Sequence, residues 1–116
     1  MASTALTSYE EFSLTIVPNR EEVVVALRGE IDLDCAAVIE GEVRELIDRG
    51  FDRVVLDLRE VSFLDSTGLH TLLSLRERAQ RAGGHLVLVP GPGAVQRIFE
   101  VTGIADRFDW WEPARR

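Results

Sequence analysis

The chain has 116 residues, a formal net charge of −7, one cysteine, two histidines and 13 basic residues, all of them arginine. This length suits one domain with its own apolar core, and the negative charge argues against sequence-independent binding to nucleic acid. Without lysine the chain has no P-loop and no Schiff-base nucleophile, and its cysteine and histidines do not supply a disulfide framework or an all-protein zinc site. No apolar run approaches ~20 residues, so we expect no membrane insertion.

The first part of the chain predicts a tail followed by a hairpin. Residues 1–11 are small and polar and lack the basic and apolar regions of a signal peptide, so we expect a flexible tail. Apolar and polar residues alternate from Phe12 to Ile16, which is typical of a half-buried strand. A turn at Pro18 precedes a second strand over residues 23–27, and the pair predicts an antiparallel hairpin.

The middle of the chain predicts a helix, a strand and a second helix. The first helix runs from about Asp34 to Arg49, and the strand over residues 54–58 is almost entirely apolar, as expected of a strand covered on both faces. Apolar residues recur at helical spacing from Leu69 onward, and Gly83 with its neighbour marks the end of that helix. The apolar face of the first helix is expected to consist of Ile39, Val43, Leu46 and Ile47.

The last third of the chain predicts another apolar strand over residues 85–89 and a third helix. The segment Gly91–Gly93 opens this helix, which continues through Val101, and a short strand over residues 107–110 follows. The inner face of the third helix is expected to consist of Ala94, Val95, Ile98, Phe99 and Thr102.

The whole pattern predicts one α/β domain. Strands that alternate with helices after an opening hairpin favour a mixed sheet of four or five strands, with the helices packed mainly on one side. We find no internal repeat or low-complexity segment. The domain is expected over residues 12–112, between the tail at residues 1–11 and a second tail at residues 113–116.

An acidic serine/threonine turn joins the strand over residues 54–58 to the second helix. Asp65, Ser66 and Thr67 lie where side-chain oxygens can cap unpaired backbone N–H groups. A phosphate on Ser66 or Thr67 would meet those N–H groups and the positive end of the helix dipole. Taken alone, the same residues also fit a plain helix cap, and Asp32 fits a cap of the first helix in the same way.

Three stretches carry a resemblance to one family. Residues 27–32 read L-R-G-E-I-D, which is similar to the G-E-hydrophobic-D turn of that family. Residues 55–69 end in F-L-D-S-T-G-L and match a strand followed by F-hydrophobic-D-S-[ST]-G-L, and residues 95–104 read V-Q-R-I-F-E-V-T-G-I. In this order and spacing the stretches resemble the anti-sigma-factor antagonists, the stand-alone STAS domains of bacteria, over residues 12–112.

The resemblance implies a cytoplasmic regulator that has no catalytic activity, metal or cofactor of its own. Its partner would be an anti-sigma factor with serine kinase activity, which phosphorylates Ser66, with Thr67 as the second choice. The unphosphorylated protein binds this kinase and so releases the sigma factor, and a phosphatase resets it. The residues expected to bind the partner are Glu30, Asp32, Asp65, Ser66, Thr67, Gly68, Leu69 and His70.

Other interpretations stay open beside this one. His70 replaces the small residue that commonly follows Gly-Leu in the family, which bears on the identity of the kinase. The strand that carries Asp57 resembles a receiver domain, and residues 65–68 faintly resemble the aspartyl-phosphate loop of haloacid-dehalogenase-type phosphatases, but both classes use a lysine that is missing here. Some STAS domains bind an ATPase as subunits of transport complexes, and the fold alone does not separate these from the antagonists.

Overall fold

The computed structural model describes residues 5–9 and 12–111. They form a mixed six-stranded sheet in the order β1-β2-β3-β4-β5-β6, with three α-helices and a short 3₁₀-helix. The strands are β1 (Ala5–Tyr9), β2 (Phe12–Asn19), β3 (Glu22–Ile31), β4 (Arg53–Leu64), β5 (His85–Val89) and β6 (Asp109–Trp110). The helices are α1 (Leu33–Asp48), α2 (Ser66–Arg81), α3 (Gly93–Val101) and the 3₁₀-helix Ala105–Arg107.

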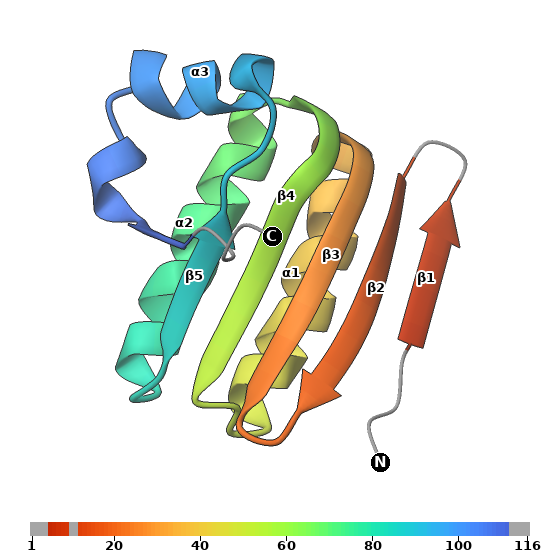
Figure 1. The fold of residues 1–116 in the computed structure, drawn as a ribbon, viewed down its shortest axis with the longest axis vertical. Coiled ribbons are helices and arrows are strands. Elements are labelled where there is room, and N and C mark those ends of the chain that lie inside the picture. The colour runs from red at the N-terminus through yellow and green to blue at the C-terminus, as the bar shows by residue number, and fades with distance from the viewer. Residues whose placement is uncertain (1–4, 10–11, 112–116) are drawn as a thin grey trace, which may run out of the picture.

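The arrangement of the layers confirms the predicted fold class. Strands β1, β2 and β3 pair antiparallel, whereas β3, β4, β5 and β6 pair parallel. Helices α1 and α2 lie side by side behind the sheet, and α3 crosses near its upper end (Figure 1). The apolar strand predicted over residues 54–58 lies inside the sheet, between β3 and β5, as its composition requires.

The N-terminal part of the chain corrects one expectation. Residues 1–11 were expected to be a tail, yet Ala5–Tyr9 forms β1 and pairs with β2 from Ala5↔Ile16 to Tyr9↔Phe12. The five expected strands correspond to β2 through β6, and β1 extends the sheet to six. An edge strand of this kind is held by main-chain hydrogen bonds to one neighbour, so its sequence need not show an apolar period. The expected tail over residues 113–116 lies outside the described residues.

Strands β3 and β4 are longer than the sequence predicts. Their apolar runs end near Leu27 and Leu58, but both strands continue through polar residues to Ile31 and Leu64. The pairing shifts register between Ala26 and Arg28 and again after Gly29, which has a φ of 100°. Such irregularities bend strands and change the direction of their side chains. Beyond them, both strands continue to the starts of α1 and α2.

The main core lies between the sheet and the helices. The predicted apolar face of α1 is buried at all of its positions, and α2 contributes Leu69, Leu72, Leu75 and Ala79. On α3 only Val95 and Phe99 are buried; Ala94 and Thr102 are exposed, so the predicted inner face was too wide. The reason is that α3 covers only the end of the sheet, and a helix there buries a narrow stripe.

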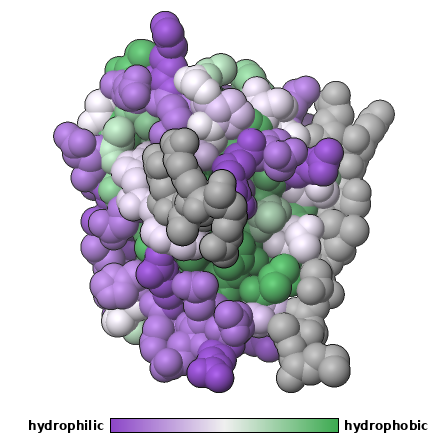
Figure 2. Space-filling model, viewed as in Figure 1, coloured by the Kyte–Doolittle hydropathy of each residue, from purple (hydrophilic) through white to green (hydrophobic). Residues whose placement is uncertain are grey.

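The sheet face away from α1 and α2 is also partly apolar. Across three neighbouring strands, Val24 pairs with Val55 and Val55 with Val87. Their neighbours along each strand belong to the main core, so these valines point to the face away from the helices. Figure 2 views it and shows apolar surface between hydrophilic side chains. The guanidinium of Arg53, at the start of β4, lies 5.3 Å from the ring centre of Trp111. None of the helices among residues 5–9 and 12–111 has the length and apolarity needed to cross a membrane.

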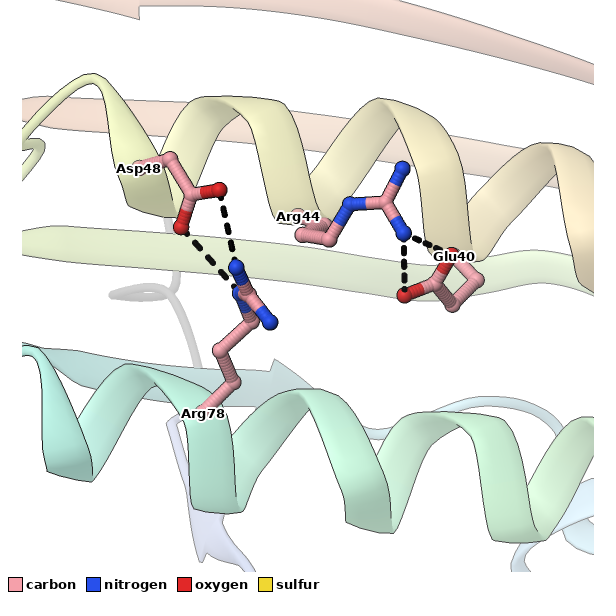
Figure 3. A network of polar contacts seen from close by, with 4 residues as sticks. All are labelled: Glu40, Arg44, Asp48 and Arg78. Atoms are coloured by element: carbon pink, nitrogen blue, oxygen red, sulfur yellow. Dashed lines mark hydrogen bonds and ion pairs between the residues drawn. The ribbon is translucent and has the colours of Figure 1, made fainter.

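An ion pair joins α1 and α2 at the back of the sheet, and a second lies within α1. The guanidinium of Arg78 on α2 donates to both carboxylate oxygens of Asp48 on α1, at 3.1 and 2.9 Å, and Arg44 pairs with Glu40 one turn away along α1 (Figure 3). The hydrogen bonds from Arg78 lower the pKa of Asp48 below its usual value. Because these groups are largely exposed to solvent, we expect the pairs to contribute little to stability.

Replacing Gly91 by alanine is expected to lower the free energy of unfolding by about 1–3 kcal/mol. A Cβ at this position would lie 2.8 Å from the carbonyl oxygen of Leu58, and backbone cannot move aside as a side chain can. Gly93 is the matched control, because a Cβ there meets nothing within 4 Å. Urea unfolding of both variants is the measurement, and equal midpoints for the two would contradict the expected clash.

Candidate functional site

The carboxyl ends of β3 and β4 bring two helix starts together. Ile31 pairs with Leu64 at the ends of these strands, and the amide of Asp65 donates to the carbonyl of Ile31 at 3.2 Å. Helix α1 begins two residues after Ile31, and α2 begins two residues after Leu64. The predicted partner-binding residues of both segments therefore lie at one edge of the sheet.

Asp32 forms the cap of α1, as its sequence position suggests. Its carboxylate Oδ1 accepts from the amides of Asp34 at 3.0 Å and Cys35 at 3.4 Å. The return bond of the capping box comes from a thiol, because the amide of Asp32 donates to Sγ of Cys35 at 3.2 Å. Asp32 is half-buried, so its carboxylate serves the helix and still faces solvent in part.

The Cys35 thiol also holds the turn that precedes α1. Its Sγ donates to the carbonyl of Glu30 at 3.1 Å, so one buried side chain joins Glu30, Asp32 and the first turn of the helix. Burial raises the pKa of this thiol, and the hydrogen bond to the Asp32 carboxylate and the charge of that carboxylate add to the increase, whereas hydrogen bonding to the Asp32 backbone opposes it. The sequence contained a signal for this role, since a polar side chain three residues after a cap is the position of the return bond.

Ionising Cys35 at high pH is expected to destabilise the fold. Its pKa is higher in the folded protein than in the unfolded chain, so its stabilising contribution is complete below the ordinary thiol pKa and is lost as the pH rises through the folded value. Cys35→Ser keeps a hydrogen-bonding group that does not ionise in this range. Urea unfolding of both proteins from about pH 7 to pH 10 should show the wild type losing more stability. Parallel pH profiles would contradict this expectation.

Ser66 is the exposed first residue of α2. Asp65 caps this helix by accepting from the amide of Gly68 at 2.9 Å, as predicted. The Ser66 hydroxyl makes no hydrogen bond to any other described residue, whereas Thr67, the second choice for phosphorylation, is half-buried. Ser66 therefore presents a free hydroxyl at the positive end of a helix dipole.

Gly68 and Leu69 do not form part of the exposed surface. Leu69 is only 2 % exposed, and Gly68 is buried where a Cβ would lie 2.7 Å from Cδ1 of Leu64 and 2.8 Å from Cγ2 of Ile31. The absence of a side chain on Gly68 lets the start of α2 approach the end of β3 closely. Both residues were expected to contact a partner; in the free chain they are buried and pack between the start of α2 and the ends of β3 and β4.

Glu30 and His70 are exposed and lie close to these helix starts along the chain. Glu30 is near the end of β3, and His70 is four residues after Ser66 on α2, so His70 and Ser66 share one face of that helix. The structure thus brings Glu30, Asp32, Asp65, Ser66, Thr67 and His70 to one edge of the molecule. Leu33 and Phe63 also lie there as exposed apolar side chains that the sequence analysis did not assign to the site.

The surroundings of Asp57 contradict the receiver interpretation. Asp57 lies within β4, which continues for seven residues to Leu64, so it is not at a strand end. Its carboxylate accepts from Nη2 of Arg59 at 2.8 Å and from the Arg59 amide at 3.0 Å. Within the described part of the chain, no group of His, Cys, Asp and Glu side chains is placed to hold a metal ion. The chemistry offered at the edge is that of a free hydroxyl among carboxylates.

Comparison with known proteins gives consistent results over almost the whole chain. The family model for the STAS domain matches residues 13–115. The anti-sigma-B factor antagonist of Bacillus subtilis is 30 % identical over 97 residues, which cover 84 % of this chain and 88 % of that protein. The anti-sigma F factor antagonist of Lysinibacillus sphaericus is 32 % identical over 95 residues, covering 80 % of each chain.

A solved structure shares both the fold and part of the sequence. The crystal structure of an anti-sigma factor antagonist from Mycobacterium paratuberculosis superposes with a TM-score of 0.77 at 27 % identity, covering 89 % of this chain and 86 % of that one. The range matched by the family model, residues 13–115, includes the motif segments and the two helix starts described above.

Proposed function

We propose that this chain, which belongs to the STAS domain family of anti-sigma factor antagonists, binds an anti-sigma factor with serine kinase activity. Binding would release the sigma factor that the kinase holds. Binding uses the edge around Asp32 and Ser66 and requires an unphosphorylated Ser66. Phosphorylation of Ser66 by the bound kinase ends the interaction, and a phosphatase restores it. The protein acts in the cytoplasm as a ligand and a substrate and catalyses nothing itself.

The observation that carries this proposal is the free, exposed hydroxyl of Ser66 beside the Asp32 turn. A kinase needs access to the acceptor oxygen, and an oxygen already engaged in a helix cap would resist transfer. Capping of α2 falls to Asp65, so Ser66 is available without loss of the cap. The relatives named as anti-sigma factor antagonists support the same partner class.

Charge explains how one phosphate could switch binding without unfolding the protein. A phosphoserine adds about −1.5 to −2 charges next to Asp65. The start of α2 offsets this repulsion by roughly 0.3–1 kcal/mol, so the domain stays folded. At an interface that matched the neutral serine, a misplaced like charge costs several kcal/mol, or about 100-fold or more in affinity.

A pull-down from the native cell extract tests this function against its alternative. Wild type, Ser66→Ala and Ser66→Glu serve as baits, and mass spectrometry identifies the captured proteins and any phosphate on the bait. Capture of a serine kinase by wild type and Ser66→Ala, with weaker capture by Ser66→Glu, supports the proposal. Equal capture of a transporter ATPase by all three baits would instead favour a transport-complex subunit.

Two substitutions of Asp32 separate the charge that the proposed partner needs from the helix cap that α1 needs. Asn caps a helix about as well as Asp, so Asp32→Asn is expected to unfold at nearly the wild-type midpoint while its phosphorylation by the cognate kinase falls. Asp32→Ala is expected to lose about 1 kcal/mol of stability in addition. Urea unfolding and initial rates of phosphate transfer are the measurements. Normal phosphorylation of both variants would reduce Asp32 to a cap.

A further inference from the structure

Two large apolar side chains at the proposed binding edge are exposed. Phe63, near the end of β4, is 47 % exposed, and Leu33, the first residue of α1, is 69 % exposed. Single exposed apolar residues are ordinary on a protein surface and call for no explanation. These two differ because they belong to the segments that also carry Asp32 and Ser66.

The sheet register places these side chains among the proposed site residues. Phe63 pairs directly with Glu30 across β3 and β4, and it precedes Ser66 by three residues. Leu33 follows Asp32 immediately. The pairing of Ile31 with Leu64 then joins the two segments, so Phe63 and Leu33 are both part of the edge formed by the two helix starts.

The carboxylates at this edge form no ion pair with another described residue. In the described part of the chain, each ion pair joins an arginine to an acid away from the edge: Glu40 with Arg44, Glu22 with Arg53, Asp57 with Arg59, Asp48 with Arg78 and Glu77 with Arg107. The acids of the edge make no such pair, and they are Glu30, Asp32, Asp34 and Asp65. Apolar side chains bordered by unpaired carboxylates complement a partner with an apolar pocket and a basic rim.

We propose that Phe63 and Leu33 are the apolar anchors by which this protein docks on its anti-sigma factor, whose surface offers an apolar pocket bordered by arginine or lysine. The inference rests on the proposed function and adds where the binding free energy comes from. Ser66 and Asp32 decide whether and how the complex forms, whereas burial of Phe63 and Leu33 holds it together. Interface energy concentrates in such central, desolvated side chains, and aromatic residues are frequent among them.

The test compares single serine substitutions by titration calorimetry with the purified anti-sigma factor. Phe63→Ser and Leu33→Ser are each expected to weaken binding about 30-fold, the change that corresponds to the ~2 kcal/mol of an interface hot spot. Val101→Ser is the matched control, because Val101 is 77 % exposed at the end of α3 and outside the edge, and its affinity should equal that of the wild type. The unfolding midpoint of each variant shows whether it is folded. If Phe63→Ser is unstable, the binding measurement on Leu33→Ser alone decides, because Leu33 is the more exposed of the two side chains.

The failure of this inference can be distinguished from failure of the proposed function. Wild type that binds the kinase and is phosphorylated at Ser66, together with unchanged affinity of both serine variants, would overturn the anchors and leave the function standing. Wild type that does not bind would remove the function and with it the anchors. Sedimentation of the free protein covers the remaining case: a wild-type dimer that Phe63→Ser or Leu33→Ser converts to monomers, with kinase affinity unchanged, would assign these side chains to a second copy of the chain and overturn the inference.

Discussion

Replacing Ser66 by alanine is expected to leave a folded protein that binds its kinase with near wild-type affinity and accepts no phosphate. The variant loses no hydrogen bond within the described part of the fold, because Asp65 caps α2 and the Ser66 hydroxyl is free. Since the proposed interface accommodates an unphosphorylated serine, alanine is expected to preserve the complex, and the variant should act as a permanently active antagonist. Calorimetry and phosphate incorporation from labelled ATP measure the two parts of this expectation.

Phosphorylated wild type is the comparison that gives the size of the effect. We expect its affinity for the kinase to be about 100-fold lower or more, at an unchanged unfolding midpoint. Ser66→Glu should fall between the two, because a carboxylate carries one charge and lacks the geometry of a phosphate. Peptide mapping locates the modified residue. Phosphate on Thr67 alone would move the switch by one residue, and phosphate on neither residue, in the presence of a confirmed partner, would refute the regulatory function.

Replacing Phe99 by alanine is expected to lower the free energy of unfolding by about 3–5 kcal/mol. Phe99 is 0 % exposed, and its ring packs edge-to-face against Phe108 at 5.4 Å and Trp110 at 4.9 Å between centroids. Removing the ring leaves a cavity where α3 and β6 meet the core, and the loss includes both aromatic contacts. For a domain whose total stability is of the order of 5–15 kcal/mol, this is a large fraction.

The same substitution separates folding from binding. Val101→Ala, two residues further along α3 and 77 % exposed, is the control and should change stability by no more than about 0.5 kcal/mol. At urea concentrations below the midpoint of its own unfolding, the Phe99→Ala protein should still bind the kinase, because α3 contributes no residue to the proposed binding edge. A cost below about 1 kcal/mol in urea unfolding would mean that the aromatic cluster does not secure α3.

Local rules in the sequence account for much of the fold. The sequence predicted the four-residue apolar face of α1 and the apolar run of β4 from the spacing of apolar residues. A helix buried on one face shows a helical spacing, whereas a strand buried on both faces shows a continuous apolar run. The caps were readable for a similar reason, since Asp32 and Asp65 bond to amides two or three residues away. The sequence also placed Ser66 at a helix start, which is the property on which its proposed role depends.

Contacts between distant segments decided the rest. Strand β1 depends on its pairing with β2, and the extension of β3 and β4 depends on register shifts between them, so neither leaves a local apolar pattern. The burial of Leu69 follows from the packing of α2 against the sheet, whereas Phe63 is exposed because it alternates with the buried Leu64 along β4. The sequence alone shows both simply as apolar residues. The sequence therefore determined which helix starts carry the candidate site. Only the tertiary structure decided that the two starts meet at one edge, because their approach depends on packing between segments that are 33 residues apart in the chain, from Leu33 to Ser66.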